Sequence, residues 1–140
     1  HGVSQRPGKP MWYGTYERDG DFFQMGEKIT VPVFALPGNP VSSYVCLYRY
    51  VLPALAKLSG APAAQKRKAA LTQAVTFKPP LTYFLPGKNL KTEENGLWVN
   101  PVQFNTSGDF ASLVETDGFL ELPIDQEEFP EGYLADFYPW

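Results

Sequence analysis

The sequence contains little of what catalytic nucleophiles and metal sites usually require. It has one cysteine, Cys46, and one histidine, His1, among 140 residues. A single thiol forms no disulfide within the chain, and these two side chains cannot supply a His/Cys metal cluster. Because no internal histidine is present to activate the thiol, we expect Cys46 to fill space on a helix rather than to react.

The sequence also lacks a large excess of one charge and long hydrophobic runs. The formal net charge is −3, which gives no reason to expect nucleic acid or a membrane surface as a partner. No apolar run reaches the roughly 20 residues that span a bilayer, and no signal peptide is visible. The composition, 44% hydrophobic and 19% charged, is that of a globular chain, and the single thiol fits a cytoplasmic location.

The charge that is present is unevenly distributed. Residues 1–60 carry six Lys/Arg and four Asp/Glu, whereas residues 61–140 carry six and eleven. We therefore expect any anion site in the first part or where the two parts meet. The chain starts with HGVSQRPGKP rather than with Met, which reads like the middle of a domain, so we also expect a fragment of a longer protein.

The first part of the chain predicts two strands. Residues 11–18 are aromatic and β-branched and end at an Asp-Gly pair, which is a hairpin signal. Residues 29–36 are apolar, but Pro32 removes one backbone donor. We therefore expect Pro32 at the start of a strand or at a sheet edge, with the strand proper over residues 33–36.

A long helix is predicted to follow. Asn39 is a suitable N-cap, Pro40 suits the first helical position, and Gly60 suits the stop. Pro53 should kink the helix near Arg49, whose carbonyl loses its donor. The order strand, tight loop, helix indicates an α/β unit. One apolar stripe follows the helical period and comprises Val41, Tyr44, Val45, Tyr48, Val51, Leu52, Leu55 and Leu58.

The pattern changes after residue 60. Residues 63–70 are small and basic and predict a linker, and later elements are short and separated by Pro-Pro, Pro-Gly and Asn-Gly turns. Recurrent short strands predict a small all-β barrel or sandwich. We therefore expect an α/β part over residues 1–62, a linker over 63–70 and a β-barrel over 71–140.

Two rigid turns, RPGKP and LPGNPVSS, are the candidate binding features. The first places Arg6 and Lys9 on a stiff loop, where two cations can clamp an oxyanion. The second is expected to present the free N–H groups of Val41, Ser42 and Ser43 at a helix N-terminus, a position that favours anions. The alternative is that these turns are structural and that the serines only cap the helix. The hydroxyl-rich stretch NTSGDFASL is open to the same two readings.

These motifs together resemble the molybdopterin molybdenumtransferase family, the MoeA proteins, whose relatives include the E domain of gephyrin. The resemblance rests on HGVSQRPGKP, on VFALPGNPVSSYVCLYRYVLPALAKLSG and on NTSGDFASLVETDGFLELP. It implies the C-terminal third of such a protein: the end of a MogA-like three-layer α/β domain followed by a small β-barrel.

The resemblance also implies site residues. The family's KPGKP loop matches here with Arg6 in place of the usual first lysine, its PGNPVS loop matches without change, and a serine-bearing turn of the barrel matches Ser107 loosely. An arginine that many members carry on an early barrel strand is missing, and Lys78 or Lys88 is the possible substitute. The implied molybdate-binding residues are Arg6, Lys9, Pro10, Pro37, Gly38, Asn39, Pro40, Ser42 and Ser107.

The function implied by the resemblance is insertion of molybdate into adenylylated molybdopterin by a Mg²⁺-dependent, homodimeric, cytoplasmic enzyme. Acidic catalytic residues are expected outside this chain, so the chain alone should be inactive, and no metal ligands are expected within it. Two alternatives stay open from the residues: a gephyrin-like scaffold that binds partner proteins, and a generic module for phosphate or another oxyanion.

Overall fold

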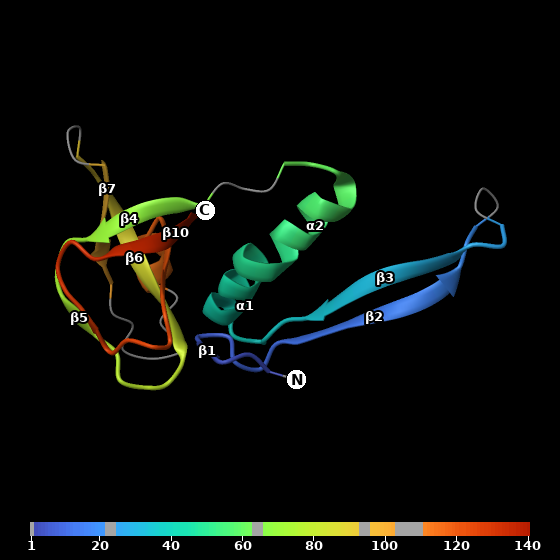
Figure 1. Ribbon diagram of the computed structural model, residues 1–140, viewed down its shortest axis with the longest axis horizontal. Helices are drawn as coiled ribbons and strands as arrows, with labels where there is room; N and C mark the ends of the chain where they lie inside the picture. Colours follow the sequence, from blue (N-terminus) through green and yellow to red (C-terminus); the bar gives the residue numbers. More distant parts are fainter. Residues whose placement is uncertain (1, 22–24, 63–65, 93–95, 103–110) are drawn as a thin grey trace.

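The computed structural model describes residues 2–21, 25–62, 66–92, 96–102 and 111–140. A hairpin and a helical segment precede a β-barrel, and the hairpin projects away from the barrel (Figure 1). None of the helices in the described ranges is long and apolar enough to cross a membrane. The elements are β1 (Gln5–Arg6), β2 (Trp12–Asp19), β3 (Lys28–Ala35), α1 (Pro40–Cys46), η1 (Leu47–Val51), α2 (Leu52–Ser59), β4 (Arg67–Leu71), β5 (Val75–Thr76), β6 (Thr82–Thr92), β7 (Gly96–Pro101), α3 (Ala111–Val114), β8 (Gly118–Leu122), β9 (Glu128–Phe129) and β10 (Leu134–Pro139).

The barrel closes because the long strand β6 has a different neighbour along each half. Its first half pairs with β8 and its second half with β7, and the order β6-β7-β4-β10-β8 returns to β6. Gly87 is paired with both neighbours at the crossover. A Cβ atom at Gly87 would lie 2.1 Å from a methyl carbon of Val99, and one at its partner Gly118 would lie 2.4 Å from the carbonyl oxygen of Tyr138. The corner therefore requires glycine at both positions.

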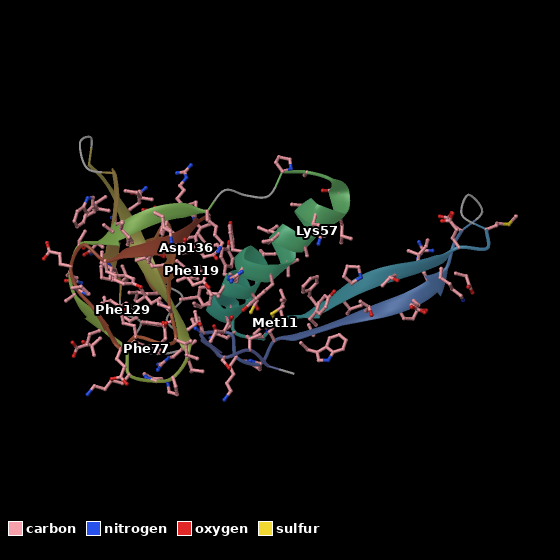
Figure 2. All side chains as sticks on the ribbon, in the orientation of Figure 1. Met11, Lys57, Phe77, Phe119, Phe129 and Asp136 are labelled. Atoms are coloured by element: carbon pink, nitrogen blue, oxygen red, sulfur yellow. The ribbon has the colours of Figure 1, made fainter. Side chains whose placement is uncertain are left out.

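The barrel interior holds the main hydrophobic core. Figure 2 shows Phe77 and Phe129 at the barrel and Phe119 on the side toward the helices. The predicted barrel is thus confirmed. The buried side chains of its core are Ala69, Leu71, Val75, Phe77, Leu85, Val99, Leu120, Leu122, Phe129, Ala135 and Phe137.

The strand β4 corrects one prediction. The small and basic character of residues 63–70 predicts a linker, but Arg67–Leu71 form a strand between β7 and β10. Ala69 is fully buried, as is Leu71. The low β-propensity of its alanines hides this strand from sequence analysis. A short helix, α3, precedes β8.

The hairpin β2–β3 confirms the turn signal after residue 18 and corrects the length of its second strand. The strand β3 begins at Lys28, not at residue 33, and Pro32 lies in its middle opposite Thr15. A two-stranded ribbon leaves each strand one free edge, so the missing donor of Pro32 breaks no ladder. The sheet of β2 and β3 has no third strand among the described residues, and they show no parallel α/β sheet.

The helical segment begins and ends where the sequence predicts. Asn39 caps α1, Pro40 occupies the first position, and Gly60 ends α2 in the left-handed conformation with φ of 69°. The irregularity expected around Arg49 is the π-helical turn η1, which ends at Val51. A proline two residues beyond this turn removes an α-helical hydrogen bond, and the wider turn accommodates that loss.

Only the first turns of this helix are buried against the barrel. Val41 and Val45 pack with Phe84 and Phe119 in a second hydrophobic cluster. The later part of the predicted stripe is exposed, with Leu58 having 63% of its surface accessible. The N-terminal part therefore depends on the barrel for its core within the described residues.

A contrasting pair of leucines tests this distribution of the core. Leu120→Ala should lower the free energy of unfolding by about 2–5 kcal/mol, because it opens a cavity in the fully buried barrel interior. Leu58→Ala should change it by less than about 0.5 kcal/mol. Urea denaturation followed by fluorescence measures both, and equal effects would contradict the assignment of the core.

Two lysines hold Asp136 across the β4–β10 pair. Nζ of Lys68 lies 2.7 Å from one carboxylate oxygen and Nζ of Lys66 lies 3.1 Å from the other. The hydrogen bond from Lys68 is the main cause that lowers the pKa of Asp136 below its ordinary value of 3.8; burial opposes it and Lys66 adds to it. The lysines are well exposed, so the gain in stability is small and sensitive to salt.

The lowered pKa of Asp136 predicts a loss of stability in acid. The contribution is present above the unfolded-state pKa, near 4, and is lost as the pH falls through the lower folded-state pKa. Asp136→Asn should therefore flatten the fall in unfolding free energy below pH 4, and 1 M NaCl should reduce the difference from the parent chain. Asp125→Asn is the control because Asp125 forms no ion pair with any described residue; the same flattening there would contradict the assignment.

Candidate functional site

The cationic loop is attached to the edge of the barrel. Strand β1 pairs in parallel with the start of β6, with Gln5 opposite Thr82 and Arg6 opposite Tyr83. The amide of Thr82 also donates to the carbonyl of Ser4 at 2.9 Å. The RPGKP turn therefore leaves the barrel at strand β6 and continues into the hairpin.

The same loop lies directly on the helix. Gly8 has a φ of +96° and is buried. A Cβ atom there would lie 2.6 Å from Nε2 of Gln5, 3.0 Å from Sγ of Cys46 and 3.4 Å from the carbonyl oxygen of Ser42. Glycine is required both for the backbone conformation and for this close approach. The RPGKP turn is thus brought against α1 at Ser42 and Cys46, a non-local contact that the sequence did not reveal.

The N-terminus of α1 is more fully capped than expected. Oδ1 of Asn39 accepts from the amide of Ser42 at 3.1 Å and from its hydroxyl at 3.4 Å. The amide of Ser43 donates to the carbonyl of Asn39 at 2.9 Å, and its hydroxyl donates to the carbonyl of Pro37. The prediction that these two amides are free is therefore wrong, because the Asn39 cap and the helical turn already occupy them.

The predicted binding residues differ in accessibility. Arg6, Lys9 and Pro10 are exposed on the loop, and within the described residues neither cation forms an ion pair. Arg6 lies close enough to Tyr83 to oppose the rise that burial causes in the pKa of that phenol.

On the second turn, Gly38 is exposed, with no atom within 4 Å of where its Cβ would be. Pro37 and Ser42 are buried, Asn39 is half-buried and Pro40 is exposed. Ser107 lies outside the described residues. Lys78 and Lys88, the possible substitutes for the missing arginine, are both exposed on the barrel.

Two pockets lie next to the loop. A pocket of about 470 Å³ is lined by Met11, Tyr13, Phe34 and other residues of the hairpin and helix, and one of about 310 Å³ reaches Thr82 and Glu121 of the barrel. The residues common to the two pockets are Val3, Arg49 and Tyr50.

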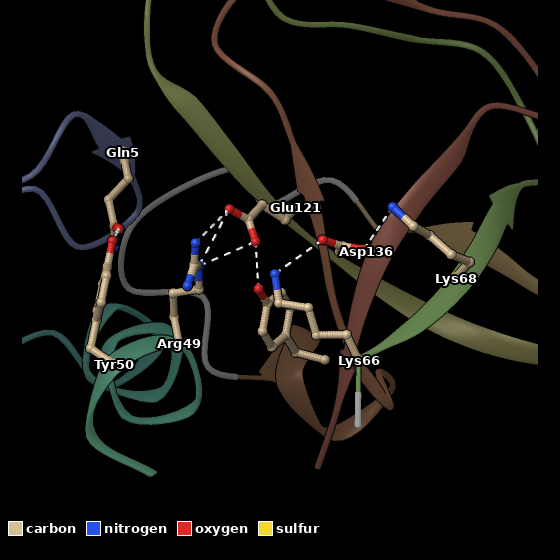
Figure 3. A network of polar contacts seen from close by, with 8 residues as sticks. Gln5, Arg49, Tyr50, Lys66, Lys68, Glu121 and Asp136 are labelled. Atoms are coloured by element: carbon tan, nitrogen blue, oxygen red, sulfur yellow. Dashed lines mark hydrogen bonds and ion pairs between the residues drawn. The ribbon is translucent and has the colours of Figure 1, made fainter. Parts of the chain in front are cut away.

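A polar network beside these pockets joins the helix to the barrel (Figure 3). Nε of Arg49 lies 3.2 Å from Glu121, and the hydroxyl of Tyr138 donates to the same carboxylate. The guanidinium also stands 5.5 Å from the ring of Tyr50 and 6.0 Å from that of Tyr138. Burial lowers the pKa of Arg49, but Glu121 and the neighbouring tyrosines outweigh it, so the net shift is upward.

From the sequence, Arg49 is expected only as the site of a kink. The signal that could have identified it was a lone arginine between two tyrosines in an otherwise apolar helical stretch. Its partner Glu121 is 72 residues away, so only the fold reveals the pair.

The described residues offer no metal site of their own. No three histidine, cysteine or acidic side chains gather in the described part of the chain.

Cys46 is buried and has hydrogen-bonding neighbours. Burial raises the pKa of its thiol to about 11, although the hydrogen bond from Gln5 lowers it. Such a thiol is a poor nucleophile at neutral pH, in agreement with the predicted packing role.

Comparison with known proteins shows which family the barrel region resembles. The model of the MoeA C-terminal region (domain IV) matches residues 68–140. A molybdopterin molybdenumtransferase from Synechocystis sp. is 41% identical over all 140 residues, which span 31% of that relative. One from Staphylococcus epidermidis is 32% identical over 106 residues, covering 74% of this chain and 25% of the relative.

Solved structures show a similarity to the same family. The crystal structure of the molybdopterin biosynthesis MoeA protein from Pyrococcus horikoshii matches the whole chain with a TM-score of 0.73 and 26% identity, and the match covers 31% of that protein. This chain thus spans about a third of the length of the relatives it matches. The closed barrel, the matched C-terminal region and the similarity along the whole chain together show that this chain belongs to the MoeA family.

Proposed function

We propose that this chain is the C-terminal part of a molybdopterin molybdenumtransferase, which inserts molybdate into adenylylated molybdopterin. The relatives that carry this name support the proposal. The observation that carries it is the contact of Gly8 with Ser42 and Cys46, which holds the Arg6–Lys9 loop against α1, the first part of the helical segment.

The proposed site binds molybdate by electrostatic positioning. Arg6 and Lys9 supply two positive charges without an ion-pair partner among the described residues, so neither must first release a carboxylate. Positioned cations stabilise charge that is already present on an oxyanion and need no covalent step from the protein.

The second turn contributes shape and donors. Pro10, Pro37 and Pro40 stiffen the two loops, and Gly38 leaves room for an anion to approach the backbone. The hydroxyl of Ser42 would exchange its bond with Asn39 for one to molybdate. Ser107, implied by the family resemblance alone, would add a further hydroxyl.

The domain organisation of the complete enzyme is part of the same proposal. The exposed hairpin and the exposed leucines of α2 support a MogA-like α/β domain that includes residues 1–62, joined to the barrel that begins with β4 at Arg67. We propose further that the complete enzyme is a cytoplasmic homodimer that uses Mg²⁺ bound by residues outside this chain.

Molybdate binding measured by calorimetry tests the site. Lys9→Ala should weaken molybdate binding by about tenfold or more, equivalent to about 1.4 kcal/mol. Lys57→Ala is the matched control, because Lys57 is exposed at the far part of the helical segment (Figure 2) and should leave the affinity unchanged. Equal effects of the two substitutions would show that only overall charge matters.

The titration should be carried out on this chain and on the longer protein that contains it, because residues outside the chain contribute to the proposed enzyme. Sulfate and phosphate competing as well as molybdate would favour a generic oxyanion module. Absence of molybdate binding by both proteins would contradict the proposal.

A further inference from the structure

We propose that Gln5 is a positioning residue that fastens the cationic loop to the helix and so sets the geometry of Arg6 and Lys9. What the loop binds rests on the proposed function; how the loop is held rests on the contacts of Gln5 alone.

Both the nitrogen and the oxygen of the Gln5 side-chain amide form hydrogen bonds. The side chain has only 2% of its surface exposed. Its Nε2 donates to the carbonyl of Pro7 at 3.0 Å and to Sγ of Cys46 at 3.7 Å. Its Oε1 accepts from the hydroxyl of Tyr50 at 2.5 Å, as Figure 3 shows. One side chain thus links the loop backbone to two positions of the helical segment.

A neutral amide is well suited to this place. The carbonyl of Pro7 needs a donor and the hydroxyl of Tyr50 needs an acceptor, and glutamine supplies both without a buried charge. Glutamate would lose the donor and lysine would lose the acceptor. Because buried polar groups require partners, the amide can satisfy both only when loop and helix keep this separation.

Cys46 adds a second fastening at the same point. Its thiol lies beneath the loop, fully buried, and donates to the carbonyl of Gly8 at 3.8 Å. The carbonyls of Pro7 and Gly8 are therefore both held from the buried side. These two residues lie between Arg6 and Lys9 in the sequence, so the fastening fixes the backbone from which both cations project.

The single thiol offers a direct probe of this fastening. Gln5→Met keeps the length and volume of the side chain but removes the amide. The loop should then open, and the rate at which a disulfide reagent labels Cys46 under native conditions should rise by at least about tenfold. Loss of the bond from Gln5 would by itself raise the pKa of the thiol and slow labelling, so a faster rate reports exposure.

Two further variants separate local opening from global unfolding. Val75→Ala weakens the barrel core, and its labelling rate should rise only as far as its unfolding equilibrium, measured in urea, requires. Tyr50→Phe removes one hydroxyl, and labelling should rise by a smaller factor, about threefold. If Gln5→Met does not fold, Tyr50→Phe becomes the deciding variant. Labelling of Cys46 in Tyr50→Phe at the same rate as in the parent protein would then overturn the proposal.

Molybdate affinity completes the test. The proposal requires faster labelling and, where the parent protein binds molybdate, an affinity at least about tenfold weaker in Gln5→Met. Unchanged labelling overturns the role of Gln5 whatever the affinity, and faster labelling with unchanged affinity overturns its role in positioning the cations. If the parent protein binds no molybdate and Gln5→Met still labels faster than the parent, the fastening is confirmed and only the proposed function is contradicted.

Discussion

Both the barrel and the loop attached to it depend on the division of β6 between two neighbouring strands. The halves of β6 pair with β8 and β7, and this closes the barrel only because Gly87 and Gly118 let the backbones meet without side chains. The outer edge at the start of β6 then remains available to β1. The barrel thus supplies a core and also the attachment point from which the cationic loop begins.

The joint between helix and barrel combines two kinds of interaction. The packing of Val41 and Val45 on Phe84 and Phe119 stabilises the joint through the hydrophobic effect, which has little directional preference. The pair of Arg49 and Glu121 is partly buried and held from several sides, so it contributes direction more than net stability. Apolar burial keeps the two parts together, while the ion pair restricts the angle at which they meet.

Local signals predicted local structure well. The cap at Asn39, the stop at Gly60 and the irregular turn before Pro53 each follow from the chemistry of residues within one or two turns. The strand of Arg67–Leu71 was missed because it is formed by its neighbours rather than by its own propensity. The contact of Gly8 with Ser42 and Cys46 was also beyond the sequence, because it depends on the whole path from barrel edge to helix.

The candidate site separates the groups that carry charge from the groups that set geometry. Arg6 and Lys9 stay in water, where a cation carries no cost of desolvation before an anion arrives. Gln5, Gly8 and Cys46 are neutral and buried, so they can hold the loop without attracting or repelling an anion over long range. This arrangement explains why the functional signal in the sequence was the exposed charges, whereas the residues that position those charges became visible only in the fold.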